Sequence, residues 1–384
     1  MDRSLELREK FSARFAGESR VYRAPGRVNL IGEYTDFNEG FVMPAAIGRY
    51  CWVAAGPRPD RKLVIHSENF SETIEWDFAA GEPVRTGRWS DYPLGIAAIL
   101  AEGGVRPGGV NLLIRGEVPL GAGLSSSAAI EVATAYALLE AAGAPVYGLQ
   151  LARLCQRAEN EFVGARTGIM DQFASVYGRE GNAIMLDCRS LEYDLVPIPE
   201  TVHLVICNTM VKHENSSGEY NQRRAQCEEA VAHLAAFYPG IKALRDVTPE
   251  QLELHRAALP DVVFRRAAHI VAENVRVQSA VAALRAGDLA QFGKLMAESH
   301  ESLRTLLEVS SPELDLMVKL ANEQEGVVGA RMTGGGFGGS TINVVEAGRA
   351  ERFRENMTRA YERASGRRPE IQICDPAEGA GPVD

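Results

Sequence analysis

The feature that most constrains the fold is a glycine- and serine-rich turn between an apolar run and a helical segment. Residues 119–133 read PLGAGLSSSAAIEVA, between the apolar run Val110–Ile114 and the alanine- and leucine-rich stretch Ala128–Ala141. This order predicts a strand, a tight loop and a helix. Gly121 and Gly123 allow the backbone to turn sharply and to approach a ligand closely.

The start of the predicted helix is a candidate anion site. Ser125, Ser126 and Ser127 stand where the helix begins, so one of them can cap it. Free amides and the positive end of the helix dipole attract phosphate, and the hydroxyls can bind phosphate oxygens or a metal. The turn is no Walker A loop, because no Gly-Lys-Ser/Thr follows the glycines. A linker or an ordinary capped helix is the alternative; since a linker would not run directly into a helix, we favour phosphate binding by this first glycine loop (Gly121–Ser127).

Composition limits the class of protein. The 384 residues suffice for two domains, and a net charge of -10 argues against general binding of nucleic acid or an anionic membrane. No apolar run reaches membrane-spanning length, and the charged segment Met1–Phe15 lacks the apolar centre of a signal peptide. The six scattered cysteines form no CxxC pair, which favours reduced thiols over a zinc site or a disulfide framework. We therefore expect a cytoplasmic enzyme, a monomer, with small-molecule substrates and neither nucleic acid nor membrane as a partner.

A second unusual block lies near the N-terminus. Residues 24–44, the N-terminal polar block, read APGRVNLIGEYTDFNEGFVMP. An apolar alternation runs from Arg27 and breaks at Gly32, so charged residues at this strand-to-loop transition can point into a cleft. Carboxylates beside hydroxyl and amide groups suit a polyol, whose hydroxyls need both donors and acceptors. The alternative is a surface turn with solvated charges.

Two carboxylates stand out in the middle of the chain. Glu159 lies near the end of a helix expected over Leu149–Phe162, where a solvated side chain is the default. A metal-binding role requires that this helix end face the first glycine loop. Asp171 follows Gly168 among apolar neighbours, where a carboxylate is costly unless it is partnered. Arg27 is a candidate partner, and capping of the next helix is the alternative.

The remaining pattern mixes short strands with helices. Five glycines within Gly334–Gly339 form a second glycine loop, which can pack against the first loop and a nucleotide, and a polar loop is expected at 212–218. The expected strands are Tyr50–Ala55, Leu63–Ser67, Thr73–Trp76, Ala183–Leu186, Val202–Cys207 and Ser340–Val345, and the expected helices are Ser4–Phe15, Tyr92–Glu102, Glu219–Phe237, Leu289–His300 and Pro312–Gln324.

Together these blocks resemble the galactokinases of the GHMP small-molecule kinase superfamily. PLGAGLSSSAA marks the superfamily, whereas PGRVNLIGEYTDFN and ESHESLR…EVSSPELD point to galactokinases, and GIMDQF and MTGGGFGG resemble later family blocks. The resemblance implies an α+β, two-domain GHMP kinase fold of mixed sheets with helices, with the active site in the cleft between the domains. It implies ATP, Mg²⁺ and transfer of the γ-phosphoryl group to the C1 hydroxyl of D-galactose, the entry to galactose catabolism. A polar break near Asp187–Leu195 suggests an N-terminal domain over 1–187 and a C-terminal GHMP-type domain over 188–384.

The resemblance also implies roles for single residues. Arg27 and Asp171 would act on the reacting hydroxyl, and Ser127 and Glu159 would hold magnesium. Because a neighbouring arginine favours the ionised carboxylate, Asp171 either accepts the proton late or mainly orients the hydroxyl. Sugar recognition would fall to Glu33, Tyr34, Asp36, Gly168 and Tyr220, adenine contact to Trp89, and phosphate contact to Gly121, Ala122, Gly123, Leu124, Ser125, Ser126 and Ser127.

Tyr34 departs from the family pattern, which usually has His at this position to contact the sugar's C6 hydroxyl. A phenol also donates and accepts, but it reaches farther and stays neutral. Tyr34 either serves the C6 hydroxyl or turns away and leaves that contact to Glu33. In the first case Tyr34→Phe impairs turnover of galactose more than of L-arabinose or 6-deoxygalactose, which lack that hydroxyl. Equal losses on all three sugars would show that Tyr34 holds the loop.

Two rival functions stay open. One is a relative that acts on another sugar, such as N-acetylgalactosamine or arabinose. The other is a galactokinase-like sensor that binds sugar and ATP without turnover. Such sensors can lack residues of the serine- and alanine-rich loop, whereas Ser125–Ala129 is complete here and Arg27 and Asp171 are present. We therefore favour a working enzyme.

Overall fold

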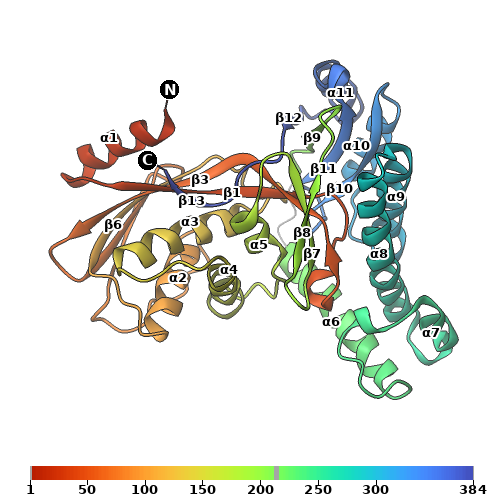
Figure 1. Ribbon diagram of the computed structural model, residues 1–384, viewed down its shortest axis with the longest axis horizontal. Helices are drawn as coiled ribbons and strands as arrows, with labels where there is room; N and C mark the ends of the chain where they lie inside the picture. Colours follow the sequence, from red (N-terminus) through yellow and green to blue (C-terminus); the bar gives the residue numbers. More distant parts are fainter. Residues whose placement is uncertain (1, 212–215, 384) are drawn as a thin grey trace.

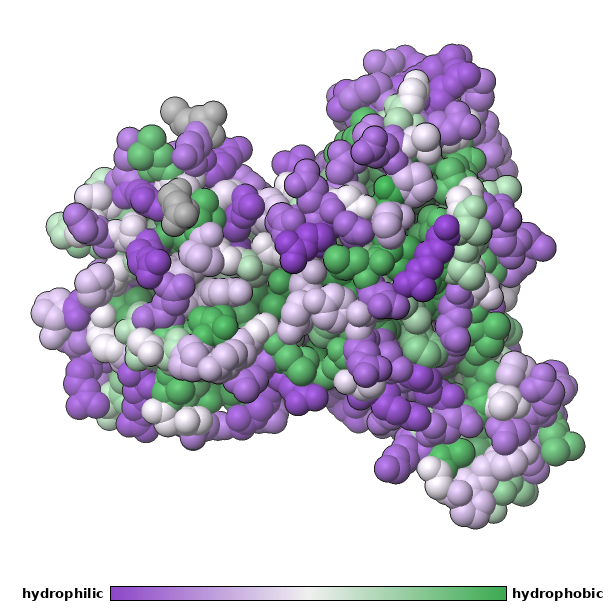
Figure 2. All heavy atoms as spheres, viewed as in Figure 1, coloured by the Kyte–Doolittle hydropathy of each residue, from purple (hydrophilic) through white to green (hydrophobic). Residues whose placement is uncertain are grey.

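The computed structural model describes the backbone of residues 2–211 and 216–383 as three sheets with helices packed on them (Figure 1). The predicted mixture of sheets and helices is confirmed. One sheet and its helices form the left side of the view, and a second sheet with long helices forms the right side. Figure 2 shows polar side chains over most of the visible face, with hydrophobic residues exposed mainly near the middle and over the right side.

The largest sheet has six strands in the order β13-β1-β3-β6-β4-β5, and every neighbouring pair is antiparallel except β4 and β6. Side chains alternate between its two faces, as the two-residue period of a strand requires. Val21 and Leu113 face helix α1, whereas the adjacent Tyr22 and Leu112 face the main core with helix α3. The strands are β1 (Arg20–Asn29), β3 (Pro44–Arg58), β4 (Lys62–Ser67), β5 (Glu72–Asp77), β6 (Gly109–Gly116) and β13 (Gly381–Val383), and the helices are α1 (Arg3–Phe15), α2 (Asp91–Glu102) and α3 (Ser126–Ala141).

The second sheet is antiparallel, in the order β10-β11-β9-β12. Helix α9 lies unusually close to β10, because Gly293 has no Cβ: one built there would lie 1.8 Å from the carbonyl oxygen of Val328. The strands are β9 (Val202–Asn208), β10 (Val327–Thr333), β11 (Ser340–Glu346) and β12 (Glu370–Cys374), and the helices are α6 (Ser216–Ala235), α7 (Pro249–Leu254), α8 (Asp261–Arg285), α9 (Leu289–Ser302), α10 (Pro312–Asn322) and α11 (Ala350–Ser365).

A third, three-stranded sheet, β2-β7-β8, lies near the middle of the view and contacts both β3 of the first sheet and helix α8 (Figure 1). The predicted domain boundary between residues 187 and 188 lies in the turn between β7 and β8, which pair as a hairpin. At the C-terminus, β13 returns to pair with β1 of the first sheet. A division of the chain at this single point therefore stays a prediction. The elements not yet given are β2 (Phe41–Val42), β7 (Asn182–Asp187), β8 (Tyr193–Pro197), α4 (Gly148–Arg157) and α5 (Met170–Tyr177).

Most expected elements are present, with one instructive difference. The helix expected over Leu149–Phe162 is α4 followed by a π-helix, Ala158–Val163, so its last turn is wider than an α-turn. The predicted loop at 212–218 falls largely on residues 212–215, which lie outside the described residues, and α6 begins at Ser216. The six cysteines all lie in the described chain, and none is in a disulfide. Within 2–211 and 216–383, no helix has the length and hydrophobicity of a membrane span.

Candidate active site

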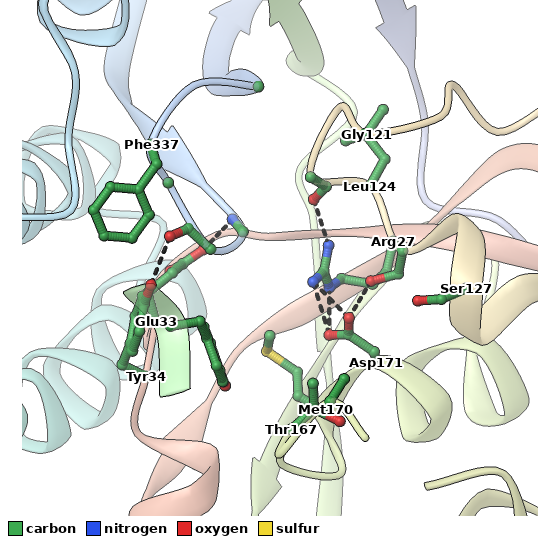
Figure 3. Close-up of a pocket in the computed structure, with 18 of the residues that line it drawn as sticks. Arg27, Glu33, Tyr34, Gly121, Leu124, Ser127, Thr167, Met170, Asp171 and Phe337 are labelled. Atoms are coloured by element: carbon green, nitrogen blue, oxygen red, sulfur yellow. Dashed lines mark hydrogen bonds and ion pairs between the residues drawn. The ribbon is translucent and has the colours of Figure 1, made fainter. Parts of the chain in front are cut away.

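The residues assigned from the sequence come together around a cavity of about 400 Å³ (Figure 3). This central pocket lies within the size range of small-molecule sites. The N-terminal polar block, both glycine loops, the π-helix, α5 and α6 all contribute to its lining. Of the assigned residues, those that line it are Arg27, Glu33, Tyr34, Asp36, Gly121, Gly123, Leu124, Ser125, Ser126, Ser127, Glu159, Asp171 and Tyr220, whereas Ala122, Trp89 and Gly168 are not among its lining residues.

The first glycine loop turns into α3 as expected, but the capping prediction is wrong. Ser125 occupies the N-cap position in a left-handed conformation with φ of 57°, and its hydroxyl makes no cap hydrogen bond. Instead the hydroxyl donates to Asp171 Oδ2. The sequence suggested a cap because serine is common there. Here the hydroxyl has a charged acceptor, and the first amides of α3 lack a capping side chain.

Arg27 and Asp171 form the pair expected from the sequence. Arg27 Nε and Nη2 donate to the two carboxylate oxygens of Asp171 at 2.8 Å each, and Nη1 donates to the Gly123 carbonyl at 2.7 Å (Figure 3). A bulge in β1 between Pro25 and Arg27 brings the strand against the loop, where the Arg27 amide donates to the Leu124 carbonyl. Asp171 lies in the first turn of α5 and is not its N-cap, so the capping alternative is wrong.

Glu159 meets the condition for a metal ligand, because the π-helix end faces the first glycine loop. Its side chain is buried and hydrogen bonded to Ser127, Thr167 and Gln172. Burial, and then the charge of Asp171, raise the pKa of the Glu159 carboxyl. A hydroxyl and a carboxylate are oxygen donors of the kind that Mg²⁺ prefers, and phosphate oxygens and water commonly complete its shell. Within the described residues, no three His, Cys, Asp or Glu side chains form a metal cluster.

Asp36 also lines the central pocket, and Gly168 makes room for its carboxylate. A Cβ built on Gly168 would lie 2.1 Å from Asp36 Oδ2, so no other residue fits there without moving the carboxylate. Gly168 lines a smaller adjoining cavity together with Asp36. Burial, and then the charge of Asp171, raise the pKa of Asp36 to about 6. Asp36 therefore changes its charge near neutral pH.

Three aromatic rings, of Tyr34, Phe37 and Tyr220, form a wall of the site. The centroids of Tyr34 and Tyr220 are 4.8 Å apart, and Phe37 packs edge-on against both rings. Tyr34 and Tyr220 also line the central pocket. Of this cluster, the rings of Tyr34 and Tyr220 present aromatic surface and hydroxyl groups to the central pocket, where a sugar ring could pack.

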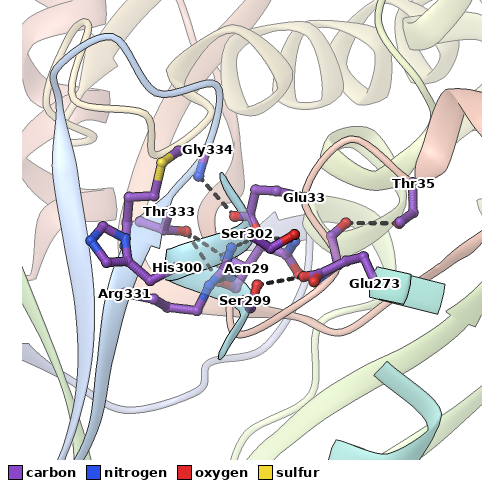
Figure 4. Close-up of polar contacts among 12 residues, drawn as sticks. Asn29, Glu33, Thr35, Glu273, Ser299, His300, Ser302, Arg331, Thr333 and Gly334 are labelled. Carbon is purple, nitrogen blue, oxygen red and sulfur yellow. Dashed lines mark hydrogen bonds and ion pairs between the residues drawn. The ribbon is translucent and has the colours of Figure 1, made fainter. Parts of the chain in front are cut away.

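Both oxygens of the Glu33 carboxylate take part in a buried network of polar contacts behind the pocket (Figure 4). Its Oε2 lies 2.5 Å from Nη2 of Arg331 and accepts from Asn29, while Oε1 accepts from the Gly334 amide at 2.9 Å. Arg331 is fully buried, so it needs a carboxylate partner. The sequence argument missed Arg331; the signal was a lone arginine inside an otherwise uncharged strand, β10.

Trp89 lies in a side pocket of about 90 Å³ that adjoins the central pocket. Its ring stacks on Phe70 at a centroid distance of 5.5 Å, and its indole nitrogen donates to Glu72. Ser126 and Ser127 line both pockets, so the start of α3 connects them. Residues of the central pocket that the sequence argument left unassigned are Ala165, Arg166, Thr167, Met170, Asn221 and Phe337.

Three protein-family models match successive parts of the chain. The galactokinase galactose-binding signature matches residues 9–57, which include the N-terminal polar block. The GHMP kinases N terminal domain matches residues 91–179, which include the first glycine loop, Glu159 and Asp171. The GHMP kinases C terminal model matches residues 280–363, which include the second glycine loop.

Known proteins match over nearly the whole chain. A galactokinase of Roseiflexus sp. (strain RS-1) is 45% identical over 380 residues, which cover 98% of this chain and 97% of that relative. The crystal structure of a Lactococcus lactis galactokinase complexed with galactose superposes with a TM-score of 0.95 at 36% identity, covering 99% of each chain. A Methanococcus jannaschii mevalonate kinase shares the fold alone, with a TM-score of 0.63 at 18% identity over 94% of this chain and 99% of its own.

Proposed function

The chain belongs to the galactokinase family of the GHMP kinases, and we propose that it transfers the γ-phosphoryl group of ATP to the C1 hydroxyl of D-galactose. The resemblance drawn from its motifs is confirmed, as is the α+β GHMP kinase fold. The observation that carries the chemistry is the two-point contact of Arg27 with Asp171 beside the carbonyl of Gly123. It puts a carboxylate and a cation next to the loop that would hold the phosphates.

Asp171 acts on the reacting hydroxyl in this proposal. Arg27 and Ser125 together donate three hydrogen bonds to its carboxylate, which fixes the direction in which the carboxylate points. The C1 oxygen forms its bond to the γ-phosphorus, the bond from that phosphorus to the bridging oxygen of ADP breaks, and the hydroxyl proton passes to Asp171. Since phosphoryl transfer has a loose transition state, Asp171 takes the proton late and mainly orients the hydroxyl. Arg27 neutralises charge on the phosphoryl group as it moves.

The nucleotide spans both pockets. The amides at the start of α3, with the hydroxyls of Ser126 and Ser127, bind the phosphates, and the base enters the side pocket beside Trp89. Ser127 and Glu159 would hold Mg²⁺, which supplies neutralisation of phosphate charge when it is bound. Glu159 is kept in place by hydrogen bonds from Thr167 and Gln172.

Galactose binds in the central pocket against Tyr220. Asp36 accepts hydrogen bonds from sugar hydroxyls, and Gly168 fixes where its carboxylate lies. Glu33 contributes through the network behind the pocket, because both of its oxygens already have protein partners. The proposal also includes two properties of the protein: it is cytoplasmic, and it acts as a monomer.

The product of the reaction tests this function. Purified protein with MgATP and D-galactose should release ADP and form galactose 1-phosphate, identified by mass spectrometry and by phosphorus–proton coupling at C1 in NMR. A parallel panel with N-acetylgalactosamine and L-arabinose tests a relative with another substrate. Phosphate on C6, a strong preference for another sugar, or sugar binding without ADP release would contradict the proposal.

A further inference from the structure

Two consecutive residues of the N-terminal polar block hold two consecutive glycines of the second glycine loop. The Glu33 carboxylate accepts from the amide of Gly334 at 2.9 Å, and the Tyr34 hydroxyl donates to the carbonyl of Gly335 at 2.6 Å. The two contacts involve successive residues in each of the two segments. The two segments are about 300 residues apart in the sequence. Together they fix both the position and the orientation of the loop at its start.

The second glycine loop in turn packs on the first. A Cβ built on Gly334 would lie 2.7 Å from the carbonyl oxygen of Gly123, and one on Gly339 would lie 3.2 Å from that of Ala122. The same Gly123 carbonyl accepts from Arg27. The two loops thus approach each other through backbone atoms, because their glycines leave no side chains between them. A movement of the second loop would therefore displace the first.

The Tyr34 side chain is built into this arrangement. It is 3% exposed, and its ring is packed against the rings of Tyr220 and Phe37. Its backbone has a φ of 67°, in the left-handed region that a tyrosine adopts at a cost. A strained backbone, a packed ring and a bonded hydroxyl point to a side chain selected for one fixed position.

We propose that Tyr34 is a positioning residue that holds the second glycine loop against the first, and that it does not select sugars by their C6 hydroxyl. Its hydroxyl proton is already donated to Gly335, so what it offers to a substrate is an oxygen that can only accept. The residue therefore acts on the phosphate side of the reaction through the loops. This inference rests on the proposed function, because it concerns the same site.

Kinetics of Tyr34→Phe on galactose, 6-deoxygalactose and L-arabinose test the inference. We expect kcat/KM for ATP to fall about tenfold, the scale of leaving one buried carbonyl without its donor. The ratio of kcat/KM between galactose and 6-deoxygalactose should keep its wild-type value. Tyr22→Phe is the matched control, because Tyr22 is also buried and donates to an oxygen, of Glu140, outside the central pocket. It should leave the KM for ATP unchanged, even where it lowers the Tm.

The outcomes are distinct. A loss of kcat/KM confined to galactose would overturn the inference and assign Tyr34 to the C6 hydroxyl of the sugar. An unchanged kcat/KM for ATP would also overturn it, because the Tyr34 hydroxyl would then be dispensable. If Tyr34→Phe does not fold, Tyr34→His supplies the same readouts with the residue usual in the family. A lower affinity for a non-hydrolysable ATP analogue in Tyr34→His would support the inference, and unchanged affinity would contradict it. Wild-type protein that fails to make galactose 1-phosphate would count against the proposed function and not against the role of Tyr34.

Discussion

At the scale of single residues, the site is a set of charges that depend on one another. Asp171 is paired with Arg27, and burial, followed by the charge of Asp171, raises the pKa of two other carboxyls of the pocket, those of Asp36 and Glu159. In the proposed mechanism the three carboxyls have different roles: Asp171 acts on the reacting hydroxyl, Asp36 binds the sugar and Glu159 lies near the phosphates. Changes at these positions should separate turnover from binding.

Asp171→Asn should lower kcat about 10²- to 10⁴-fold, because the amide cannot accept the hydroxyl proton. Sugar binding should change much less than kcat, since the amide oxygen still accepts one of the two hydrogen bonds that Arg27 donates to the carboxylate. Steady-state kinetics and calorimetric galactose binding on the same sample measure both effects. Asp194→Asn is the control, an exposed carboxylate paired with Arg285. Near-normal kcat in Asp171→Asn would remove this residue from the mechanism.

Galactose affinity should weaken as the pH falls through 6. The pKa of Asp36 is raised to about 6, so its acceptor carboxylate is lost as the pH drops below that value. If the ionised form binds, the Kd for galactose rises about tenfold between pH 7 and pH 5. Calorimetry without ATP isolates this effect from titration of the nucleotide. Asp36→Asn should bind weakly with no such step, and a step that persists in the variant would assign it to another group.

Gly168→Ala should raise the KM for galactose about 10- to 100-fold, because the new methyl group displaces the Asp36 carboxylate by an ångström or more. Its backbone is not left-handed, so the fold should be retained. The KM for ATP should stay near the wild-type value. Gly48→Ala, where a Cβ meets nothing within 4 Å, provides the control. Equal effects on the KM values for ATP and sugar would show that the substitution acts on the fold instead.

At the scale of elements, the two glycine loops form one unit. Both loops are rich in glycine, so much of the contact between them is made by backbone atoms, and side chains of other segments, such as Arg27 and Tyr34, hold their carbonyl groups. The first starts after β6 and runs into α3, and the second joins β10 to β11. Their contact brings the N-terminal end of α3 to the second sheet.

Gly334→Ala should therefore impair ATP use more than it impairs the fold. Its φ of 80° strains any other residue, and its Cβ would lie 2.7 Å from the Gly123 oxygen. We expect kcat/KM for ATP to fall at least about tenfold, on the scale of an ångström of misplacement. Gly366→Ala is matched for strain, with a φ of 72° and nothing within 4 Å of its Cβ. It should cost about 1 kcal/mol of stability and no ATP affinity. Equal kinetic losses in both variants would contradict the role of the loop contact.

At the scale of the whole molecule, the pocket is shared between distant parts of the chain. Arg27 belongs to β1, Asp171 to α5 and Tyr220 to α6. A ligand that contacts all three stabilises their mutual arrangement, because it binds the folded state and has no site in the unfolded chain.

Galactose should accordingly raise the Tm. At 100 times its Kd it adds about 2.7 kcal/mol, which corresponds to a rise of about 3–5 °C for a chain of this size. Differential scanning fluorimetry across a galactose titration measures the shift, with L-sorbose as a sugar of different hydroxyl geometry for comparison. The same shift in Asp36→Asn, or no shift in the wild type, would contradict the assignment of the central pocket to galactose.

The sequence by itself determined those features that depend on neighbouring residues. The strand, glycine turn and helix around residues 119–133 follow from local periodicity and from the backbone freedom of glycine. The family could be identified because its motifs are short and contiguous. The pairing of Arg27 with Asp171 was also predictable, because an aspartate in apolar surroundings requires a partner. These inferences need no knowledge of how distant segments meet.

Only the tertiary structure decided which groups were already occupied. The position of Ser125 in the sequence suggested a helix cap, but its hydroxyl donates to Asp171, 46 residues away. The motif around Glu33 suggested that its side chain binds the sugar, yet its oxygens accept from or pair with Arg331, Asn29 and Gly334. Each side chain has few hydrogen-bonding positions, and a partner hundreds of residues away can fill them with no trace in the local pattern. For this reason residue types predicted the kind of site, whereas the packing of distant strands and loops decided which residues are free to act in it.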